Sequence, residues 1–353
     1  MDHFVVFPVN ADGIFLNPKL VGKALDDAMS PPFDFGDVFI YSHGWWTTGN
    51  DAMALYGQYT IELAKTVLLL NGTINNPPRH SLGVGIHWPS TLSEDSVSLP
   101  QVFEPVSYYQ MGSRANQVGA NGLFASLRRA LRVRQENGGN PFRLTLIGHS
   151  FGCRVVCKAL QQLWQDVNKP GTPLGYKDFL ATIKIRVVLL QAAFKNDEFN
   201  VGGNYESVAN MPDIKILVTT SQLDLALNEL FPKAETANNI AHLDFHEAIA
   251  LGAGVRPLQN VPNAQAPGGG PTGKTINLYN AHNGGVPIQV PQWLAYGDVP
   301  QLGINERMLV ADLTKLHAAR VQNGDYSWSL FSGSHSDISS TEIYNLIAGF
   351  TFQ

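Results

Sequence analysis

A serine in the middle of the chain stands between two glycines, and its setting predicts a nucleophile. The turn Gly148-His149-Ser150-Phe151-Gly152 fits the pattern Gly-x-Ser-x-Gly, in which a serine lies at a sharp bend between a strand and a helix. The pentapeptide alone can occur in any loop, so its flanks decide the interpretation. Residues 143–147 read as a buried strand. An apolar stripe at helical spacing follows the turn: Cys153, Val156, Cys157, Leu160, Leu163 and Trp164.

A serine hydroxyl needs a base to take its proton and an acid to orient that base. For this kind of turn the chain order is serine, then aspartate or glutamate, then histidine. Asp224 follows the apolar run 214–219, so we expect it at the carboxyl end of a strand, where such sheets build their sites. Asp197 and Glu198 follow the preceding strand and compete for the role. An aspartate that merely caps a helix at 225–231 is the structural alternative for Asp224, which we favour as the acid.

Two histidines compete for the role of the base. His335 lies in a loop of small residues after the last predicted strand and before the last predicted helix. His282 also follows a strand-like run, but no helix comes after it because residues 286–291 continue in extended form. We favour His335, since the base is expected on the loop between the last strand and the last helix.

Attack on a carbonyl group creates an oxyanion, which two N–H donors must stabilise. The N–H of Phe151 is the first predicted donor, and the second comes from the loop after the first parallel strand, where we choose Trp45. Trp45 and Trp46 could instead fill the core. Adjacent residues of an extended segment point to opposite sides, so at least one tryptophan is expected to face the cleft. We predict that Trp46, His43 and His149 contact the substrate.

Two further patterns lack the context that their chemistry requires. Residues 268–275 fit a phosphate-binding P-loop, yet no strand precedes them and no helix follows. His242 and His246 are four residues apart on an expected helix, but a third ligand and the usual glutamate after the first histidine are missing. The sequence therefore predicts neither a metal site nor an organic cofactor.

Strands and helices alternate from residue 37 to the end of the chain, which predicts an α/β fold with a mostly parallel central sheet and helices on both faces. Before that point, residues 4–7 and 14–16 flank Asp12-Gly13 and suggest a hairpin. We interpret residues 1–353 as one domain with a Pro/Gly-rich insertion at 240–300, a possible lid or cleft wall. The remaining predicted strands cover 38–41, 84–88, 183–190, 275–279 and 308–311, and the predicted helices run to about 70, over 111–134 and over 338–350.

Composition limits the possible partners and location. The chain is 44% hydrophobic and carries a formal net charge of −5, which argues against a nucleic-acid binder. No run of 18 apolar residues suggests a transmembrane segment, and the N-terminus lacks the pattern of a signal peptide, so we expect a cytoplasmic location. Cys153 and Cys157, four residues apart on one helix, are interpreted as core residues rather than as a disulfide or a reactive thiol.

The chain resembles a group of bacterial α/β-hydrolases, long grouped as a family of unknown function and labelled esterase/lipase-like. The resemblance covers residues 37–231 and 305 to the end, and it implies Asp224 and His335 as acid and base. Phe151 departs from the methionine that members often carry, and the insertion is unlike the compact core. The matching segments are Ile40–Trp45, Asn50–Ala52, Trp88–Ser90, Gly148–Gly152, Thr220–Leu227, Val310–Leu313 and Ser334–Ser336.

These observations together predict a serine hydrolase. We expect it to cleave a carboxylic ester of a small-molecule or lipid-like substrate through an acyl-enzyme intermediate. Thioester and amide cleavage use the same catalytic parts. A binding module that keeps a hydrolase fold without turnover is the alternative from a different class.

Overall fold

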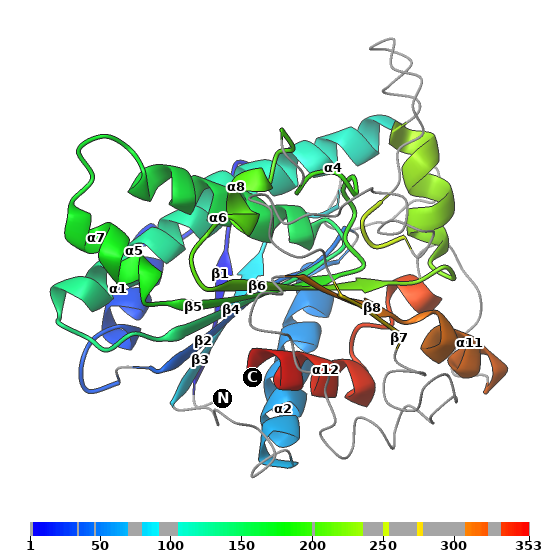
Figure 1. Ribbon diagram of the computed structural model, residues 1–353, viewed down its shortest axis with the longest axis horizontal. Helices are drawn as coiled ribbons and strands as arrows, with labels where there is room; N and C mark the ends of the chain where they lie inside the picture. The colour runs from blue at the N-terminus through cyan, green and yellow to red at the C-terminus, as the bar shows by residue number, and fades with distance from the viewer. Residues whose placement is uncertain are drawn as a thin grey trace.

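A parallel β-sheet forms the centre of the protein (Figure 1). The computed structural model describes residues 3–33, 35–45, 47–69, 80–91, 105–199, 202–235, 250–253, 274–277, 308–323 and 333–352. Seven strands follow one another across the sheet in the order β1-β3-β2-β4-β5-β6-β8, and the short strand β7 pairs in parallel with the outer edge of β8. The strands are β1 (His3–Pro8), β2 (Asp37–Ser42), β3 (Ser81–His87), β4 (Arg143–His149), β5 (Lys184–Leu190), β6 (Ile214–Thr220), β7 (Lys274–Asn277) and β8 (Met308–Asp312).

The central strands are buried along their length, as the apolar runs in the sequence predicted. Every residue of β2 and of β4 is buried, because helices cover both faces of the sheet. In the register of the sheet, Gly148 at the end of β4 stands opposite Ser42 of β2 and Leu189 of β5. The loops that leave the carboxyl ends of neighbouring strands therefore meet at one edge.

Helices cover the sheet on two faces (Figure 1). The first face carries α1 (Pro18–Ala28), α4 (Pro105–Val118), α5 (Phe124–Glu136), α6 (Gly152–Val167), α7 (Leu174–Ala181) and α8 (Glu206–Ala209). The opposite face carries α2 (Gly49–Leu69), α11 (Thr314–Gln322) and α12 (Thr341–Thr351). This arrangement confirms the predicted parallel sheet with helices on both faces.

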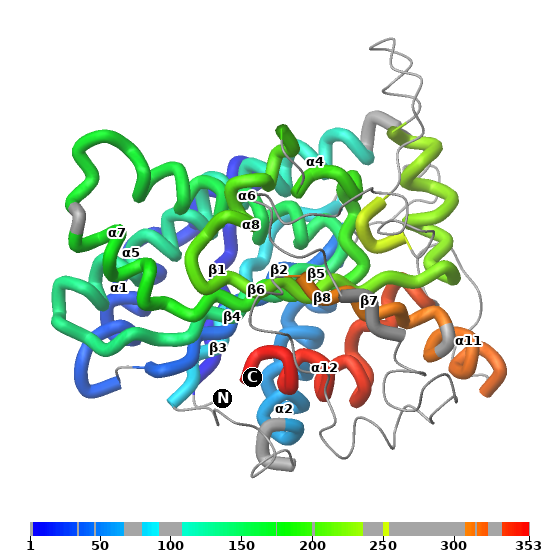
Figure 2. The backbone as a smooth tube through the Cα atoms, in the orientation of Figure 1, coloured from blue at the N-terminus to red at the C-terminus, as the bar shows by residue number. Residues whose placement is uncertain are grey.

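Segments far apart in sequence lie side by side on the second face. In Figure 2 the blue tube of α2 runs next to the red tube of α12. Tyr59 of α2 and Tyr344 of α12 make a T-shaped ring contact with 5.0 Å between centroids. The Tyr59 hydroxyl also donates a hydrogen bond to the carbonyl of Ile338. Helix α2 therefore supports the chain just beyond His335.

The expected N-terminal hairpin is confirmed only as a short turn, and residues 4–7 do not pair with residues 14–16. Strand β1 pairs in parallel with β3. Residues 8–10 meet residues 14–16 in an isolated antiparallel bridge between Val9 and Phe15, with hydrogen bonds from the N–H of Asn10 to the carbonyl of Ile14 and from the N–H of Leu16 to the carbonyl of Pro8. The side chain of Asn10 closes a tight turn by accepting hydrogen bonds from two backbone N–H groups. Ile14 is 54% exposed, so the second half of the expected hairpin buries too little apolar surface to form a strand.

The predicted helix at 111–134 is longer and has an interruption. It begins at Pro105 and ends at Glu136, and a π-helical turn over Gly119–Leu123 separates α4 from α5. The π-turn packs against α6. The helix expected to start at 225 is present, with α-helix over 231–235, but its first turn is a second π-helix, η2 (Ala226–Leu230). The hydrophobic spacing of the sequence does not distinguish such wider turns from α-helix.

The predicted insertion at 240–300 lies mostly outside the described residues. Residues 250–253 and 274–277 are described. In the first of these, Ala250 forms a bridge with Lys195 and Ala253 forms one with Ser221. Both partners lie beyond the carboxyl ends of β5 and β6, so this part of the insertion is at the edge where the loops meet. The interpretation of the whole segment as a lid stays a prediction.

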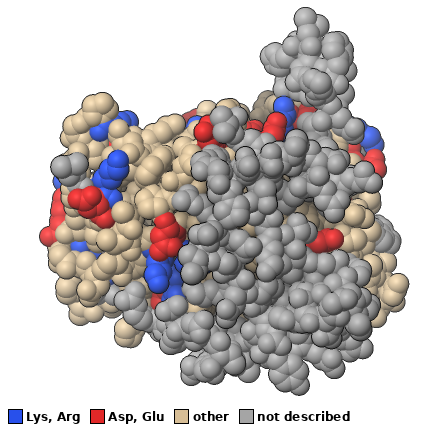
Figure 3. Space-filling model, in the orientation of Figure 1, with Lys and Arg blue, Asp and Glu red and all other residues tan. Residues whose placement is uncertain are grey.

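Charges on the described surface are mixed in sign. Figure 3 shows Lys and Arg atoms close to Asp and Glu atoms on the described part of one face. Arg129 of α5 pairs with Asp26 of α1, and Arg128 pairs with Asp166 of α6. Among the described helices, none combines the length and the apolar character needed to cross a membrane.

Candidate active site

Ser150 occupies a strained position at the bend between β4 and α6. Its φ is +52°, in the left-handed region that non-glycine residues rarely adopt. A Cβ added at Gly148 would lie 2.7 Å from the backbone N of Cys153, and one added at Gly152 would lie 2.5 Å from the carbonyl oxygen of His43. Both positions therefore require glycine, because the strand, the helix and the loop after β2 approach one another closely.

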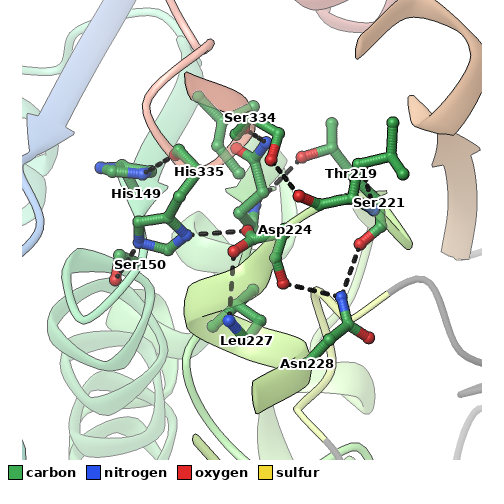
Figure 4. Close-up of polar contacts among 12 residues, drawn as sticks. His149, Ser150, Thr219, Ser221, Asp224, Leu227, Asn228, Ser334 and His335 are labelled. Atoms are coloured by element: carbon green, nitrogen blue, oxygen red, sulfur yellow. Dashed lines mark hydrogen bonds and ion pairs between the residues drawn. The ribbon is translucent and has the colours of Figure 1, made fainter. Parts of the chain in front are cut away.

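His335 lies between Ser150 and Asp224 (Figure 4). Its Nε2 is 3.1 Å from Oγ of Ser150, and its Nδ1 is 2.7 Å from Oδ2 of Asp224. A carboxylate only accepts hydrogen bonds, so the proton belongs on Nδ1 and Nε2 is left to accept the serine proton. The structure thus brings together the three residues that the sequence predicted as nucleophile, acid and base.

Asp224 is fully buried, and its two carboxylate oxygens have different partners. Its Oδ1 accepts the backbone N–H of Leu227 at 3.1 Å, while Oδ2 faces His335. The helix-capping interpretation therefore holds for one oxygen only. Of the competing acids, Glu198 accepts the N–H of Asn204 at 2.9 Å and, like Asp197, lies in the turn after β5.

Hydrogen bonds hold the loops that carry the acid and the base. The amide of Asn228 donates to the carbonyl of Asp224 at 2.8 Å (Figure 4). Ser334, next to His335, donates from its hydroxyl to the carbonyl of Leu223. Its own carbonyl accepts the side-chain amide of Gln191 at 2.7 Å. The loop after β5 therefore supports the base loop as well.

His149 contacts both the base loop and the cavity. Its Nε2 lies 2.8 Å from the carbonyl oxygen of His335 and can donate a hydrogen bond to it. Burial lowers the pKa of His149 to about 3, with the nearby His335 acting in the same direction, so its ring is neutral. A neutral ring adds no positive charge beside His335 when that residue gains a proton. His149 lines the cavity described below, which fits the predicted contact with substrate.

His43 supports the loop after β2 and does not line the cavity. It is fully buried and stacks on Trp88, with ring planes 4° apart and centroids at 5.2 Å. Its Nδ1 is 2.9 Å from the carbonyl oxygen of Gly44, and its Nε2 accepts the backbone N–H of Trp88 at 3.3 Å. Burial lowers its pKa to about 3. The structure thus places the His43 ring behind the loop after β2 and away from the cavity, whereas the sequence predicted that His43 contacts the substrate.

The two predicted oxyanion donors, Phe151 and Trp45, belong to segments that pass next to Ser150. Phe151 occupies the N-cap position of α6, and its N–H donates no hydrogen bond within the described part of the chain. A Cβ on Gly44 would lie 2.9 Å from Cβ of Ser150, so the loop that carries Trp45 passes beside the nucleophile. The rings of Trp45 and Phe151 make a T-shaped contact at 5.7 Å. Trp46 lies outside the described residues.

A cavity of about 350 Å³ opens next to Ser150 and His335. Most of its described walls are apolar or aromatic, and Asp51 is the carboxylate among them. Oδ2 of Asp51 accepts the Thr48 hydroxyl at 2.6 Å. The apolar and aromatic lining residues are Trp45, Leu55, Tyr108, Phe151, Ala193, Ala226, Leu227, Leu230, Phe231 and Ile338.

Sequence reasoning missed most of the cavity wall. Ala226, Leu227 and Leu230 belong to η2, directly after the acid, and their apolar spacing was the available signal. Tyr108 comes from α4, and its hydroxyl donates to the buried Glu235 at 2.9 Å. No local pattern in the sequence links Tyr108 to a site built from segments more than 40 residues away.

The alternative sites from the sequence fall largely outside the described residues. His242, His246 and His282 are among the undescribed residues, as are residues 268–273 of the P-loop pattern. Lys274 and Thr275, which end that pattern, lie in strand β7 where a P-loop would begin a helix. Within the described residues, no group of three or more His, Cys, Asp or Glu side chains could hold a metal ion. Cys153 and Cys157 are buried free thiols, in agreement with the predicted core role.

In comparisons with known proteins, no family model and no curated sequence matches the chain. The resemblance to esterase/lipase-like hydrolases therefore stays a prediction from the sequence.

Proposed function

We propose that the protein is a serine hydrolase of the α/β-hydrolase fold that cleaves carboxylic esters with an uncharged, apolar acyl group. One observation carries the proposal: an unbroken chain of contacts from Ser150 through His335 to the buried Asp224, beside an apolar cavity. A serine with such partners, at a bend between strand and helix, has the geometry for acyl transfer.

The reaction begins with attack of Ser150 Oγ on the ester carbonyl carbon. His335 Nε2 takes the serine proton, and the carboxylate of Asp224 stabilises the imidazolium that forms. The N–H groups of Phe151 and Trp45 stabilise the oxyanion, with α6 adding the positive end of its dipole. His335 then gives its proton to the leaving alcohol oxygen, and the acyl group stays on Ser150. Water activated by the same histidine hydrolyses this acyl-enzyme and restores the free serine.

The cavity supports the choice of acyl group. An acyl chain that binds against these apolar walls loses contact with water. This burial stabilises binding by roughly 25 cal/mol for each Å² of apolar surface removed from water. Asp51 would repel an acyl chain that ends in a carboxylate. We therefore expect neutral aliphatic acyl groups to react faster than acyl groups with a terminal carboxylate. Thioesters and amides use the same catalytic parts and serve as comparison substrates.

Hydrolysis of a p-nitrophenyl ester series from acetate to palmitate tests the proposal. We expect turnover by the native protein and a loss of about a thousandfold or more in kcat for Ser150→Ala. A matched control is Ser126→Ala, which removes a buried hydroxyl from α5 and should keep native turnover. Turnover that survives in Ser150→Ala contradicts the proposal. A folded native protein that hydrolyses none of the esters, thioesters or amides supports the binding-module alternative.

A further inference from the structure

A second set of serine, histidine and aspartate lies behind the proposed catalytic residues. Nδ1 of His317 is 2.8 Å from Oγ of Ser221, and Nε2 of His317 is 3.7 Å from Oδ2 of Asp337. Ser221 and His317 are fully buried, and the Asp337 side chain is 8% exposed. Substrate therefore has no access to Ser221, and this set serves no nucleophilic chemistry of its own.

The three residues come from three separate segments. Ser221 follows β6 and lies three residues before Asp224, whereas Asp337 lies two residues after His335. His317 comes from α11, between them. Its ring thus contacts the loop that carries the acid and the loop that carries the base.

Hydrogen bonds connect Ser221 to the position of Asp224. The Ser221 Oγ accepts the N–H of Leu223 at 3.2 Å, and the amide of Asn228 donates to the carbonyl of Ser221 at 2.9 Å (Figure 4). The same amide donates to the carbonyl of Asp224. A shift of Ser221 would therefore move the acid loop as a unit.

The base loop is anchored through Asp337. Arg320, one turn beyond His317 on α11, places its Nε 3.0 Å from Oδ2 of Asp337 and its Nη2 2.6 Å from Oε2 of Glu342 in α12. These contacts link α11 to the start of α12. Partly buried ionic contacts of this kind act mainly by fixing geometry, since their desolvation offsets much of their attraction.

Burial and the neighbouring charges keep the His317 ring uncharged. Burial lowers the pKa of His317 to about 3, and the nearby Arg320 and His335 act in the same direction, so the ring is neutral. The separation of 3.7 Å between Nε2 of His317 and Oδ2 of Asp337 exceeds hydrogen-bond distance, so the ring faces this carboxylate through an electrostatic contact. Nδ1 shares a hydrogen bond with the Ser221 hydroxyl at 2.8 Å, and Ser221 Oγ accepts the Leu223 N–H, so hydrogen bonds connect Leu223 through Ser221 to His317.

We propose that His317 is a positioning residue that holds the acid loop and the base loop in register, so that His335 stays aligned with Asp224 and Ser150. This inference rests on the proposed hydrolase function. Alignment matters for rate because a displacement of about 1 Å in a catalytic group can cost about a hundredfold in turnover. The role needs no contact between His317 and substrate.

Steady-state kinetics of His317→Leu, His317→Asn and Ser221→Ala test the proposal on the best ester. We expect His317→Leu to lower kcat about ten- to a hundredfold while KM changes by no more than about twofold, since the cavity wall is untouched. His317→Asn should recover most of the loss, because its amide can keep the hydrogen bond with Ser221. Ser221→Ala should resemble His317→Leu, and the double variant should be no worse than either single variant, as for residues acting as one unit.

A control variant separates a positioning role of His317 from a merely structural one. Ser126→Ala removes a buried hydroxyl far from these loops, and it should keep native kcat even where it lowers the melting temperature. Equal losses of kcat in Ser126→Ala and Ser221→Ala overturn the proposal, as does native kcat in His317→Leu. If His317→Leu does not fold, the smaller change Ser221→Ala decides the question. The Ser150→Ala variant tests the proposed function separately. Turnover that does not depend on Ser150 contradicts the hydrolase function, whatever the His317 variants show.

Discussion

At the scale of single residues, the site depends on contacts between side chains that are distant in sequence. Ser150 and His335 are 185 residues apart, yet Oγ and Nε2 lie 3.1 Å from each other. The sequence predicted this pairing because the bend around Ser150 fixes the chain order of its partners. The interactions around them had no such pattern. Nothing local in the sequence indicates that His149 donates to the carbonyl of His335, or that His317 reaches Ser221.

The choice between the two candidate bases gives the first prediction. His335→Ala removes the group that accepts the serine proton, so kcat should fall by about a thousandfold or more while binding and oxyanion contacts remain. His282→Ala, in a segment outside the described residues, should keep most of its turnover. Ester hydrolysis by the two purified variants measures both effects. The assignment of the base is wrong if His282→Ala is the inactive variant.

At the scale of elements, long apolar runs predicted the strands well. Six of the residues at 183–190 are apolar, and every residue of β5 after Lys184 is buried, including Arg186. The predicted strand differs from the observed one by a single residue at its start. Prediction failed where the partner lies elsewhere in the chain. Residues 4–7 form a strand through parallel pairing with Gly83–Ile86, which no local hairpin signal reveals. The π-helical turns and the helix α11 were missed for the same reason, since packing rather than local spacing determines them.

The bend between β4 and α6 yields a prediction at this scale. Gly152→Ala places a Cβ 2.5 Å from the carbonyl oxygen of His43 and even closer to that of Ser42, so backbone must move. We expect destabilisation by several kcal/mol, or failure to fold, from the forced shift of the packed backbone. Chemical denaturation followed by circular dichroism measures the free energy of unfolding.

Gly57→Ala is the matched control, because nothing lies within 4 Å of the new Cβ in the middle of α2. It should increase the free energy of unfolding by roughly 0.5–1 kcal/mol through better helix propensity. Equal effects of the two substitutions would contradict the close approach seen at Gly152.

At the scale of the whole molecule, three buried neutral histidines make stability depend on pH. Burial lowers the pKa of His43, His149 and His317 to about 3 in the folded protein, whereas an unfolded histidine titrates near 6.5. Between these two values the unfolded chain binds more protons than the folded one. The stabilisation is therefore complete above about pH 6.5 and is lost as the pH falls towards 3.

This linkage gives a quantitative expectation. Each of the three histidines should lower the free energy of unfolding by about 1.4 kcal/mol per pH unit well below pH 6.5, or about 4 kcal/mol per unit together. Urea unfolding at pH 7.5, 6.0 and 5.0 measures the slope. His317→Leu, if folded, should reduce that slope by about a third. A free energy of unfolding that is constant or rises between pH 6.0 and 5.0 contradicts the burial of these rings as neutral groups.

The most direct measurement is the reaction of the folded protein with a fluorophosphonate probe, followed by mass spectrometry. This probe forms a covalent bond with a serine only where a base takes the hydroxyl proton. We predict one adduct per chain, located on Ser150, absent in Ser150→Ala and formed far more slowly in His335→Ala. No adduct on a folded sample, or an adduct that persists in Ser150→Ala, would contradict the proposal that Ser150, His335 and Asp224 form a catalytic site.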